Sequence, residues 1–501
     1  MMDKDAVLNA LRVIVGDAHV LTEGDLTAYE QDWRKRERGR ALAVVRPANT
    51  PEVAAVVKCC AGAGVSIVPQ GGNTGMVVGS TPDASGTQVV LSLQRLNKVR
   101  RVDSANLTVT VEAGCILQTL QEACDTQGFL FPLSLAAEGS CTIGGNLATN
   151  AGGTQVVRYG NTRELCLGLE VVTAQGKIWD GLTGLRKDNT GYDLRHLFIG
   201  SEGTLGIITA ATMRLYPLPA AQLTAFAAVP SLEAAVQLLG LAHQHLNAGL
   251  TGFEVIGDFA LGLVRKHFPQ QKVPFGGEAA AALGSPKQGA APTGGSEPHP
   301  VGSVGAPYYV VLENSDHESE DHARQQFERL LEVALERGCV LDAVVAENLA
   351  QARALWHIRE SIPLAQAQEG LNIKHDISIS VSRIPAFVQE ADAALQAAFP
   401  GVRLVNYGHL GDGNLHYNVQ APLDADAETF LTTQEGPVNT LVYALVDQYR
   451  GSISAEHGIG SLKRDKLEAH KSPVALAAMR AIKQALDPQN TLNPGRVLRP
   501  A

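Results

Sequence analysis

The chain has 501 residues, too many for one ordinary hydrophobic core, so we expect two or three domains. With 45% hydrophobic and 18% charged residues its composition is globular, and its formal net charge of -10 argues against nucleic acid as a partner. Residues 1–18 mix acidic with apolar side chains, unlike a signal peptide, and no apolar run approaches the ~18 residues of a spanning helix. We therefore expect a cytoplasmic protein without a transmembrane segment.

The first part of the chain predicts an α+β domain. Residues 1–40 are expected to form an N-terminal helical segment, and residues 41–218 alternate short β-rich runs with glycine-rich turns. The run ALAVVRP is followed by PEVAAVVKCCAGAG, which predicts an amphipathic helix that begins near Pro51 and ends at Gly62 or Gly64. The strand SIVPQ follows it directly.

Longer helical patterns begin after Pro217, among them SLEAAVQLLGLAHQHLNAG, ESEDHARQQFERLLEVALERG and AENLAQARALWHIRESI. They predict a second α+β domain over residues 219–485, followed by a C-terminal segment, residues 486–501. Within the second domain, residues 275–307 are mostly Gly, Ala, Pro and Ser with hardly any large apolar side chain. We expect a mobile insertion there.

Two glycine-rich loops in the first domain are candidates for binding a large cofactor. PQGGNTGMVVGS, residues 69–80, follows a strand, and its glycines let successive backbone N–H groups converge on an anion such as a pyrophosphate. Taken alone, an ordinary glycine-rich turn explains this loop equally well, since neither GxGxxG nor the P-loop pattern is present. The longer run LSLAAEGSCTIGGNLATNAGGTQ shifts the balance, because such glycine density is easiest to explain where a planar ligand approaches the main chain.

Over residues 41–217 these motifs resemble the FAD-binding family of vanillyl alcohol oxidase and p-cresol methylhydroxylase. The resemblance implies a two-subdomain FAD-binding domain of p-cresol methylhydroxylase type. Some members tether the flavin through a His in the pyrophosphate loop, whereas residues 69–80 contain neither His nor Cys, so we expect non-covalent FAD. The positions that the resemblance assigns to the cofactor are Gly71, Gly72, Asn73, Thr74, Gly75, Met76, Gly139, Ser140, Ile143, Gly144, Gly145, Asn146, Thr149, Gly153 and Ile207.

In the second domain, NYGHLGDGNLHYNV, residues 406–419, predicts a hairpin whose two-residue turn is the Asp-Gly pair. Such a turn pairs His409 with His416 and Tyr407 with Asn418. Directly opposed Cβ atoms lie roughly 4.5 to 5.5 Å apart, so both imidazoles can hold one divalent ion, with Asn418 on the same face. An isolated His pair is more often structural.

The turn SAEHGIG, residues 454–460, supplies a carboxylate and a further imidazole between glycines. Two His and one carboxylate form a common catalytic zinc set, which Glu456 completes. The neighbouring His457 is then available as a base. Alone, this turn is a weak signal.

Two cations are candidates for binding a substrate carboxylate. Arg359 in ALWHIRESI offers a bidentate fork, and Lys374 in LNIKHDISIS offers a point charge, although an Arg on a helix is more often solvated. His375 lies in phase with Ile373 and Ile377, which predicts a core or boundary residue.

Together, GHLGDGNLHYNV and EHGIG are similar to motifs of the FAD-linked 2-hydroxy-acid dehydrogenases, and the resemblance covers essentially the whole chain except residues 275–307. This group contains D-2-hydroxyglutarate dehydrogenase, D-lactate dehydrogenase and a glycolate oxidase subunit, and it implies a substrate (cap) domain with an antiparallel sheet. The 2-hydroxyglutarate branch matches most closely. Its pattern implies zinc on His409, His416 and Glu456, substrate contacts from Arg359, Lys374 and Asn418, His457 as catalytic base, and Asn493 of the LNPG motif at the flavin.

The implied reaction is hydride transfer from C2 of a D-2-hydroxy acid to flavin N5, giving the 2-oxo acid, while the metal polarises the 2-hydroxyl and His457 takes its proton. One position departs from the pattern. Where the 2-hydroxyglutarate enzymes can carry a substrate-contacting Thr four residues after the Arg, this chain has Pro363, which also lacks a backbone N–H. D-lactate or glycolate is therefore an alternative substrate.

Two other functions would use the same residues differently. One is a flavin-free metal hydrolase built on the His-His-Glu set, and the other is a non-catalytic flavin subunit, against which the Arg and Lys argue. The sequence does not identify the electron acceptor, and quinone, cytochrome and electron-transfer flavoprotein all remain open. A homodimer is compatible with the family resemblance.

Overall fold

The computed structural model describes residues 4–275 and 305–499, and the chain divides into two compact units. The first unit comprises Met1–Gly153, Tyr159–Leu218 and Glu456–Ala501, and the second comprises Thr154–Arg158 and Pro219–Ala455. This division differs from the expected domain limits in that residues 1–40 and 456–485 group with the first unit.

The insertion expected at residues 275–307 falls mostly outside the described residues. At its two edges, Phe275 and Ala306 are buried, and both belong to a hydrophobic cluster of the second unit.

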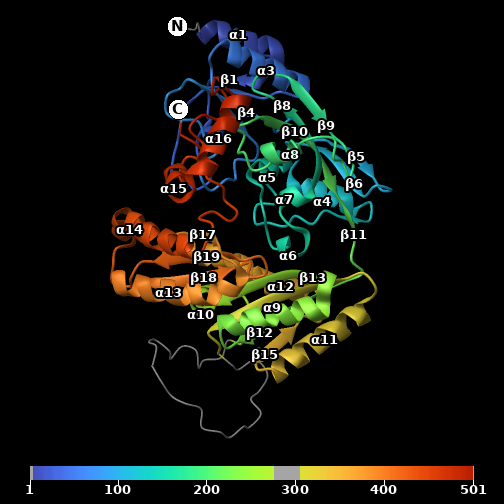
Figure 1. The fold of residues 1–501 in the computed structure, drawn as a ribbon, viewed down its shortest axis with the longest axis vertical. Coiled ribbons are helices and arrows are strands. Elements are labelled where there is room, and N and C mark those ends of the chain that lie inside the picture. The colour runs from blue at the N-terminus through green and yellow to red at the C-terminus, as the bar shows by residue number, and fades with distance from the viewer. Residues whose placement is uncertain (1–3, 276–304, 500–501) are drawn as a thin grey trace. The chain divides into compact units, whose positions relative to one another are not determined.

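The first unit contains two main sheets that share one hydrophobic core (Figure 1). The order in the four-stranded sheet is β1-β2-β4-β3, with β2, β4 and β3 parallel, and the antiparallel five-stranded sheet has the order β5-β6-β10-β8-β9. The strands are β1 (Val20–Leu21), β2 (Ala41–Val45), β3 (Ile67–Gln70), β4 (Gln88–Ser92), β5 (Val99–Asp103), β6 (Thr108–Glu112), β7 (Phe129–Leu130), β8 (Cys166–Val172), β9 (Ile178–Gly181), β10 (Ile207–Arg214) and β11 (Tyr216–Pro217). The helices are α1 (Lys4–Val15), α2 (Thr27–Glu30), α3 (Thr50–Gly62), α4 (Leu117–Asp125), α5 (Ile143–Thr149), α7 (Thr162–Leu165), α8 (Arg195–Phe198), α15 (Arg464–His470) and α16 (Pro473–Leu486).

Helix α3 forms where the sequence predicts it. The side chain of Asn49 caps the N-terminus by accepting the backbone N–H of Glu52 at 2.9 Å, and Pro51 lies in the first turn, where its missing N–H is not needed. One face buries Val53, Val56, Val57 and Cys60 in the core of the unit.

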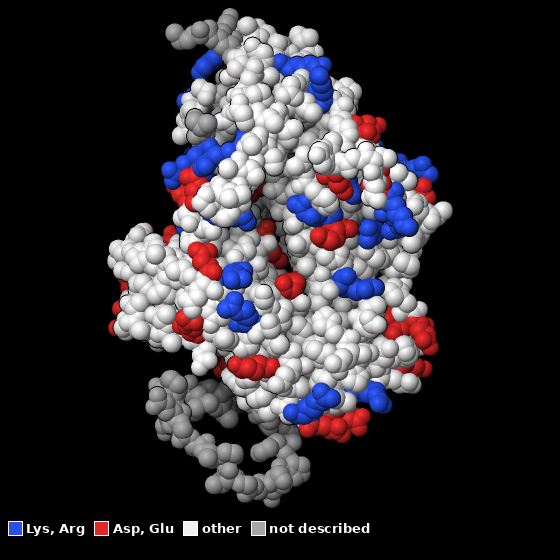
Figure 2. Space-filling model, in the orientation of Figure 1, with Lys and Arg blue, Asp and Glu red and all other residues white. Residues whose placement is uncertain are grey.

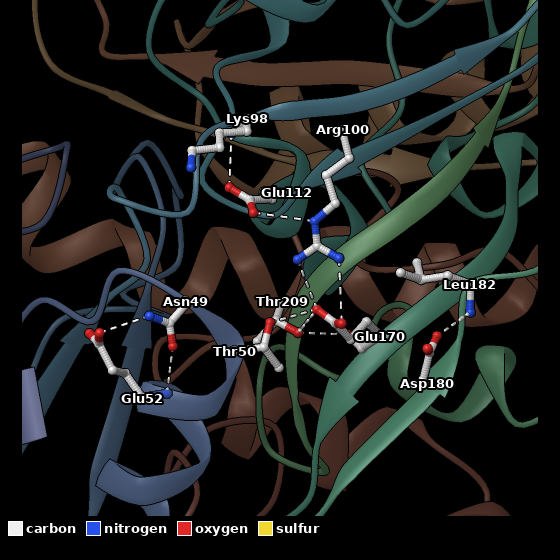
Figure 3. A network of polar contacts seen from close by, with 10 residues as sticks. All are labelled: Asn49, Thr50, Glu52, Lys98, Arg100, Glu112, Glu170, Asp180, Leu182 and Thr209. Atoms are coloured by element: carbon white, nitrogen blue, oxygen red, sulfur yellow. Dashed lines mark hydrogen bonds and ion pairs between the residues drawn. The ribbon is translucent and has the colours of Figure 1, made fainter.

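Glu170 connects helix α3 to the five-stranded sheet of the first unit (Figure 3). Its carboxylate on β8 accepts the hydroxyl of Thr50, at the start of α3, at 2.6 Å and that of Thr209 on β10 at 2.8 Å. The guanidinium of Arg100 on β5 reaches the same carboxylate at 3.2 Å and also donates to Glu112. Helix α3 is thereby attached to the five-stranded sheet.

The second unit is built on one eight-stranded sheet with the path β15-β12-β14-β13-β18-β19-β16, from which β17 pairs with β19 (Figure 1). All of its pairings are antiparallel. The strands are β12 (Ala221–Val229), β13 (Leu250–Gly257), β14 (Tyr308–Asp316), β15 (Asp342–Val345), β16 (Asn372–Ile373), β17 (Asp376–Ser378), β18 (Arg403–Gly408) and β19 (Asn414–Gln420). The helices are α9 (Leu232–Leu246), α10 (Asp258–His267), α11 (Glu320–Glu336), α12 (Leu349–Glu369), α13 (Ile384–Ala398) and α14 (Ala427–Gln448), and α6 (Val156–Tyr159) spans a boundary between the units.

Strand alternation decides which side chains of this sheet meet which helices. One face packs into a cluster with α9, α11, α13 and α14, and the opposite face packs against α10 and α12. On β13, Phe253 and Val255 point to the first face, so Glu254 between them points to the side of α12. On β19 the same alternation sends His416 and Asn418 to the side of α12, because Leu415, Tyr417 and Val419 fill the other cluster.

The expected α+β class with an antiparallel sheet in the second unit is confirmed. Among the described residues, no helix combines the length and the apolar character that a membrane crossing requires. On the face drawn in Figure 2, basic and acidic side chains are interspersed.

The substitution Glu170→Gln tests the connection between α3 and the five-stranded sheet. Burial alone would raise the pKa of Glu170, but hydrogen bonds from Thr50, Arg100 and Thr209 outweigh it and lower the pKa below its usual value. We expect E170Q to lower the free energy of unfolding at pH 7 by about 1 to 2 kcal/mol, a value that allows for partial solvent screening. Because the folded-state pKa is depressed, this difference is present above the unfolded-state pKa and disappears as the pH falls through the folded-state pKa.

Asp180→Asn is the matched control for E170Q. Asp180 lies on the neighbouring strand β9 and its carboxylate accepts the exposed backbone N–H of Leu182 at 3.2 Å (Figure 3). Denaturant unfolding of both variants at pH 7 and pH 4 measures the effect. An E170Q curve that coincides with that of D180N at pH 7 would contradict the assignment.

Candidate functional site

In the first unit, the two glycine-rich loops pack against each other. A Cβ added to Gly71 would lie 2.3 Å from Oγ1 of Thr142, and one added to Gly72 would lie 2.0 Å from the carbonyl oxygen of Ser140. Only glycine permits this approach. The structure therefore brings the loop after β3 together with the segment that leads into α5, as a shared cofactor site requires.

Asn73 shapes the first loop through its side chain. Its φ of 53° is left-handed, and its amide donates to the backbone carbonyls of Ala28 at 3.0 Å and Gln31 at 2.8 Å while accepting the hydroxyl of Ser80 at 2.9 Å. These hydrogen bonds attach the middle of the loop to residues 28–31 and to Ser80.

The second loop is equally constrained by its backbone contacts. Gly144 packs on Ala113, where an added Cβ would come within 2.6 Å of the Ala113 Cβ, and Gly153 packs on the carbonyl oxygen of Ser134 at 1.8 Å from an added Cβ. The side chain of Ile143 lies in the core and that of Thr149 donates to the carbonyl of Gly145 at 3.0 Å. Of the remaining predicted cofactor positions, Thr74 and Met76 are partly buried. Gly75, Gly139 and Ser140 are exposed, and Asn146 and Ile207 are buried.

The residues present fit a bound FAD. Two side-chain oxygens near the loops, Oγ1 of Thr142 and Oδ1 of Asn493, are buried. Neither has a hydrogen-bond partner among the described residues. Buried polar atoms are rarely left without a partner, so both atoms point to a ligand with complementary groups.

Glu202 was not predicted, and it organises the turn that carries two of the predicted site residues. Its buried carboxylate accepts the backbone N–H groups of Ile459 and Gly460, each at 2.7 Å. Gly458 and Gly460 have φ of 78° and 52°, and a Cβ on Gly458 would meet the same carboxylate at 2.8 Å. Glu202 thus fixes the EHGIG turn that presents Glu456 and His457.

The C-terminal segment returns to the glycine loops of the first unit. The backbone N–H of Asn493 donates to the carbonyl of Ile67 on β3 at 2.7 Å. Its side-chain amide donates to the carbonyls of Gly79 at 2.9 Å and Glu202 at 2.7 Å. Asn493 therefore lies between the end of the first loop and the residue that anchors the EHGIG turn.

In the second unit, the predicted hairpin exists but its register differs by two residues. The strands end at Gly408 and begin again at Asn414, so five residues form the turn instead of the expected Asp-Gly pair. Tyr407 pairs with His416, and Asn418 pairs with Val405 instead of Tyr407. The prediction was wrong because turn residues 409–413 fold as a wider turn, with the N–H groups of Gly413 and Asn414 on the carbonyl of His409.

The two imidazoles nevertheless face each other. The ring centroids of His409 and His416 lie 5.5 Å apart with an interplanar angle of 75°. His409 reaches this position from the turn, and His416 reaches it from β19.

Glu254 joins His409 to Arg359. It is fully buried on β13, where one carboxylate oxygen receives Nδ1 of His409 and the other receives Nε of Arg359 on α12 at 2.7 Å. Burial alone would raise the pKa of Glu254, but the charges and hydrogen bonds of His409 and Arg359 lower it to about 2. Arg359 is only 6% exposed, so it is not one of the solvated arginines that are more common on helices.

The predicted substrate contacts lie on neighbouring parts of the same sheet. Lys374 is half-buried between β16 and β17. Asn418 accepts the backbone N–H of His375 at 3.1 Å and donates to Gln366 on α12 at 3.0 Å. His375 is a core residue, as predicted, and its Nδ1 lies 2.8 Å from the carbonyl of Tyr417.

The chain leaves the second unit at the peptide bond between Ala455 and Glu456, after the N–H of Ala455 has bonded to the carbonyl of Asp376 at 3.3 Å. His409 and His416 belong to the second unit, and Glu456 is the next residue along the chain after that unit ends. Two imidazoles and a carboxylate are a donor set that suits zinc and similar divalent ions.

Sequence reasoning missed both buried carboxylates, Glu202 and Glu254. Each interrupts an apolar or glycine-rich stretch, GSEGTLG in one case and LTGFEVIG in the other. A single acidic residue in a strand whose neighbours are all apolar must be paired when buried, and this was the available signal. Pro363, the position that departs from the family pattern, lies inside α12 one turn after Arg359.

Two family models match the chain. The FAD binding domain matches residues 41–181, and the C-terminal domain of FAD linked oxidases matches residues 218–497. Among curated relatives, the D-2-hydroxyglutarate dehydrogenase of Xanthomonas citri pv. viticola is 40% identical over 475 residues, which cover 94% of this chain and 92% of the relative. The mitochondrial D-2-hydroxyglutarate dehydrogenase of Arabidopsis thaliana is 37% identical, covering 97% of this chain and 80% of the relative.

Solved structures confirm the fold. The structure of p-cresol methylhydroxylase with substrate bound superposes with a TM-score of 0.72 at 17% identity, covering 99% of this chain and 97% of that one. Alkyldihydroxyacetonephosphate synthase superposes with a TM-score of 0.71 at 17% identity, covering 98% and 86%. The FAD-binding fold of p-cresol methylhydroxylase type is therefore established.

The substitution Glu202→Ala tests the anchoring of the EHGIG turn. It leaves two buried N–H groups without acceptors, so we expect a loss of about 2 to 4 kcal/mol in the free energy of unfolding. We also expect faster amide hydrogen exchange in the peptide that contains residues 456–462, because its N–H groups at Ile459 and Gly460 lose their partner.

Glu122→Ala is the control for E202A, since Glu122 lies on α4 and its carboxylate accepts only an exposed amide of Gln118 at 2.9 Å. Exchange mass spectrometry and denaturant unfolding provide the measurements. Unchanged exchange at residues 456–462 in a folded E202A protein would disprove the anchoring role.

Proposed function

The chain belongs to the FAD-linked oxidases and is a flavin-dependent oxidoreductase, and from this premise we propose that it oxidises a D-2-hydroxy acid resembling 2-hydroxyglutarate to the 2-oxo acid. The observation that carries this proposal is the group formed by the buried Arg359, Glu254 and His409 with the partly buried His416. It combines a cation suited to a carboxylate with imidazoles suited to a metal, within one unit of the chain. The names of the relatives support the same substrate class.

FAD supplies the acceptor for a hydride when it is bound, and Gly71, Gly72 and the segment 139–153 are the parts of the chain that would hold it. The residues of the first loop carry no nucleophile that could form a bond to the flavin, since residues 69–80 contain neither His nor Cys. We propose non-covalent binding on this basis.

Arg359 and Lys374 would bind the substrate carboxylate. Nε–H of the Arg359 guanidinium donates to Glu254, and the planar fork of a guanidinium suits a bidentate contact with a carboxylate. Burial strengthens such a contact, because the guanidinium faces little competition from water. Asn418 is held by His375 and Gln366 and can present its remaining amide hydrogen to a ligand.

His409, His416 and Glu456 would hold a divalent metal, which we propose to be zinc. A metal held there would supply Lewis-acid polarisation, and His457, next to Glu456, would accept the proton of the 2-hydroxyl. The turn that Glu202 fixes determines where both Glu456 and His457 point.

Pro363 favours D-lactate or glycolate as the alternative substrate, because it offers neither a hydroxyl nor a backbone N–H to a second carboxylate. A five-carbon diacid requires a partner for that group elsewhere in the chain.

Anaerobic reduction of the bound flavin tests the proposed reaction. We expect D-2-hydroxyglutarate to bleach the flavin absorbance of the wild-type protein faster than D-lactate, D-malate or glycolate, and L-isomers to leave it unchanged. His457→Ala should lower the rate of reduction by 10²- to 10⁴-fold, roughly the contribution of a general base, while the FAD content stays the same.

His243→Ala serves as the control for H457A, because His243 lies on α9 in the second unit and is exposed. The assignment of His457 fails if H457A keeps the wild-type rate at saturating substrate. The proposed reaction itself fails if the purified protein carries no flavin, or if no 2-hydroxy acid reduces it.

Removal of the metal tests its role separately. Treatment with a chelator should lower the rate of flavin reduction at least 10²-fold without releasing FAD, and added zinc should restore it. The variant His416→Ala should behave like the chelated protein and should not recover with zinc. A chelated, zinc-free protein that retains full activity would remove the metal from the proposal.

A further inference from the structure

We propose that Glu254 is a positioning residue that holds the metal-binding His409 and the substrate-binding Arg359 in one fixed arrangement, so that affinity for metal and affinity for substrate depend on the same carboxylate. This inference rests on the proposed function and goes beyond it, because Glu254 itself touches neither metal nor substrate. Its two oxygens are divided between the two partners, Oε1 to His409 and Oε2 to Arg359.

The contact with His409 decides which imidazole nitrogen faces the metal. An ionised carboxylate only accepts hydrogen bonds, so Nδ1 of His409 must carry the proton. The lone pair then lies on Nε2, which is the nitrogen left for coordination. A carboxylate behind a ligating His fixes the ring orientation and raises its basicity.

The contact with Arg359 fixes the other half of the arrangement. The guanidinium is bonded through Nε to Glu254 and lies over the ring of Tyr407 with its central carbon 4.8 Å from the ring centroid. The hydrogen bond at Nε and the stacking on Tyr407 together leave the Arg359 guanidinium little freedom to rotate. Its terminal nitrogens are therefore presented in one direction before substrate arrives.

These contacts form a closed circuit. Tyr407 pairs with His416 across β18 and β19, and their ring centroids lie 4.9 Å apart. His416 faces His409, which returns to Glu254. The circuit links β13, α12, β18, β19 and the turn between the last two, so Arg359 and both imidazoles are held by residues that contact one another.

Burial makes Glu254 dependent on its partners. A carboxylate with no exposed surface is tolerated only when it is paired, and removal of its charge takes away the ion pair that it forms with the buried Arg359 guanidinium. A structural role alone would predict lower stability, whereas a positioning role also predicts a change in zinc affinity without substrate present.

The test compares Glu254→Gln and Glu254→Asp with the control Glu313→Gln. Glu313 is a partly buried acid on the adjacent strand β14, where its carboxylate accepts the hydroxyl of Thr251 at 2.8 Å and Nε1–H of Trp356 on α12 at 3.1 Å. It therefore matches Glu254 in its place in the sheet and in its contact with α12.

Zinc affinity of the metal-free, FAD-loaded protein is measured by competition with a chromophoric chelator, and KM and kcat are measured by steady-state kinetics with excess zinc. We expect E254Q to weaken zinc binding 10- to 100-fold, the usual effect of removing such a carboxylate, and to raise KM at least 10-fold. E313Q should keep both values within twofold of the wild type. E254D keeps the charge with a shorter reach, so we expect it to recover part of the zinc affinity.

The bound FAD provides a check on folding, since its predicted residues belong to the first unit and Glu254 belongs to the second. If E254Q does not fold, E254D carries the comparison, and a folded E254D with wild-type zinc affinity and KM overturns the inference. So does a folded E254Q that binds zinc and substrate as the wild type does. If the wild type binds no zinc, the metal part of the proposed function is wrong and this inference falls with it, whereas a failure of the inference alone leaves wild-type zinc binding intact.

Discussion

The first unit depends on one buried carboxylate that accepts backbone N–H groups from a distant part of the chain. Glu202 binds the N–H groups of Ile459 and Gly460, and its own backbone carbonyl receives the side chain of Asn493. Burial raises the pKa of Glu202, which the two N–H groups oppose. A buried carboxylate is unfavourable without hydrogen-bond donors, so Glu202 and the two N–H groups of the EHGIG turn stabilise each other. The turn therefore has a defined conformation before any ligand binds.

The second unit uses a related solution with a different outcome. Glu254 also lies without solvent contact, but its partners are side chains that carry charge or can carry it, instead of backbone amides. Glu202 therefore fixes the path of the main chain, and Glu254 fixes the orientation of functional groups. In each unit, one buried acid therefore determines an arrangement that local sequence preferences alone do not produce.

Local patterns made most of the fold predictable. Helix α3 begins at its Asn49 cap and Pro51 as expected, and the strand after it follows at once, since caps, proline and apolar spacing act over a few residues. The sequence predicted that His409 and His416 face each other across a two-residue turn. The structure instead has a five-residue turn, and His409 faces His416 from within that turn. The burial of Arg359 and the roles of Glu202 and Glu254 could not be derived, because each depends on contacts between residues about 100 or more positions apart.

The return of the C-terminus has a consequence for how the protein is made. Ile67 pairs with Leu492, and Asn493 bonds to the end of the first glycine loop, so the unit that contains residue 67 is unfinished until residues 492 and 493 have left the ribosome. The second unit, by contrast, contains a nearly continuous stretch of chain and can fold during synthesis. Cofactor loading would then be a late event in biogenesis, and a chain that stopped before residue 492 would keep the pairing of β3 with β4 but lack the bridge from Leu492 to Ile67.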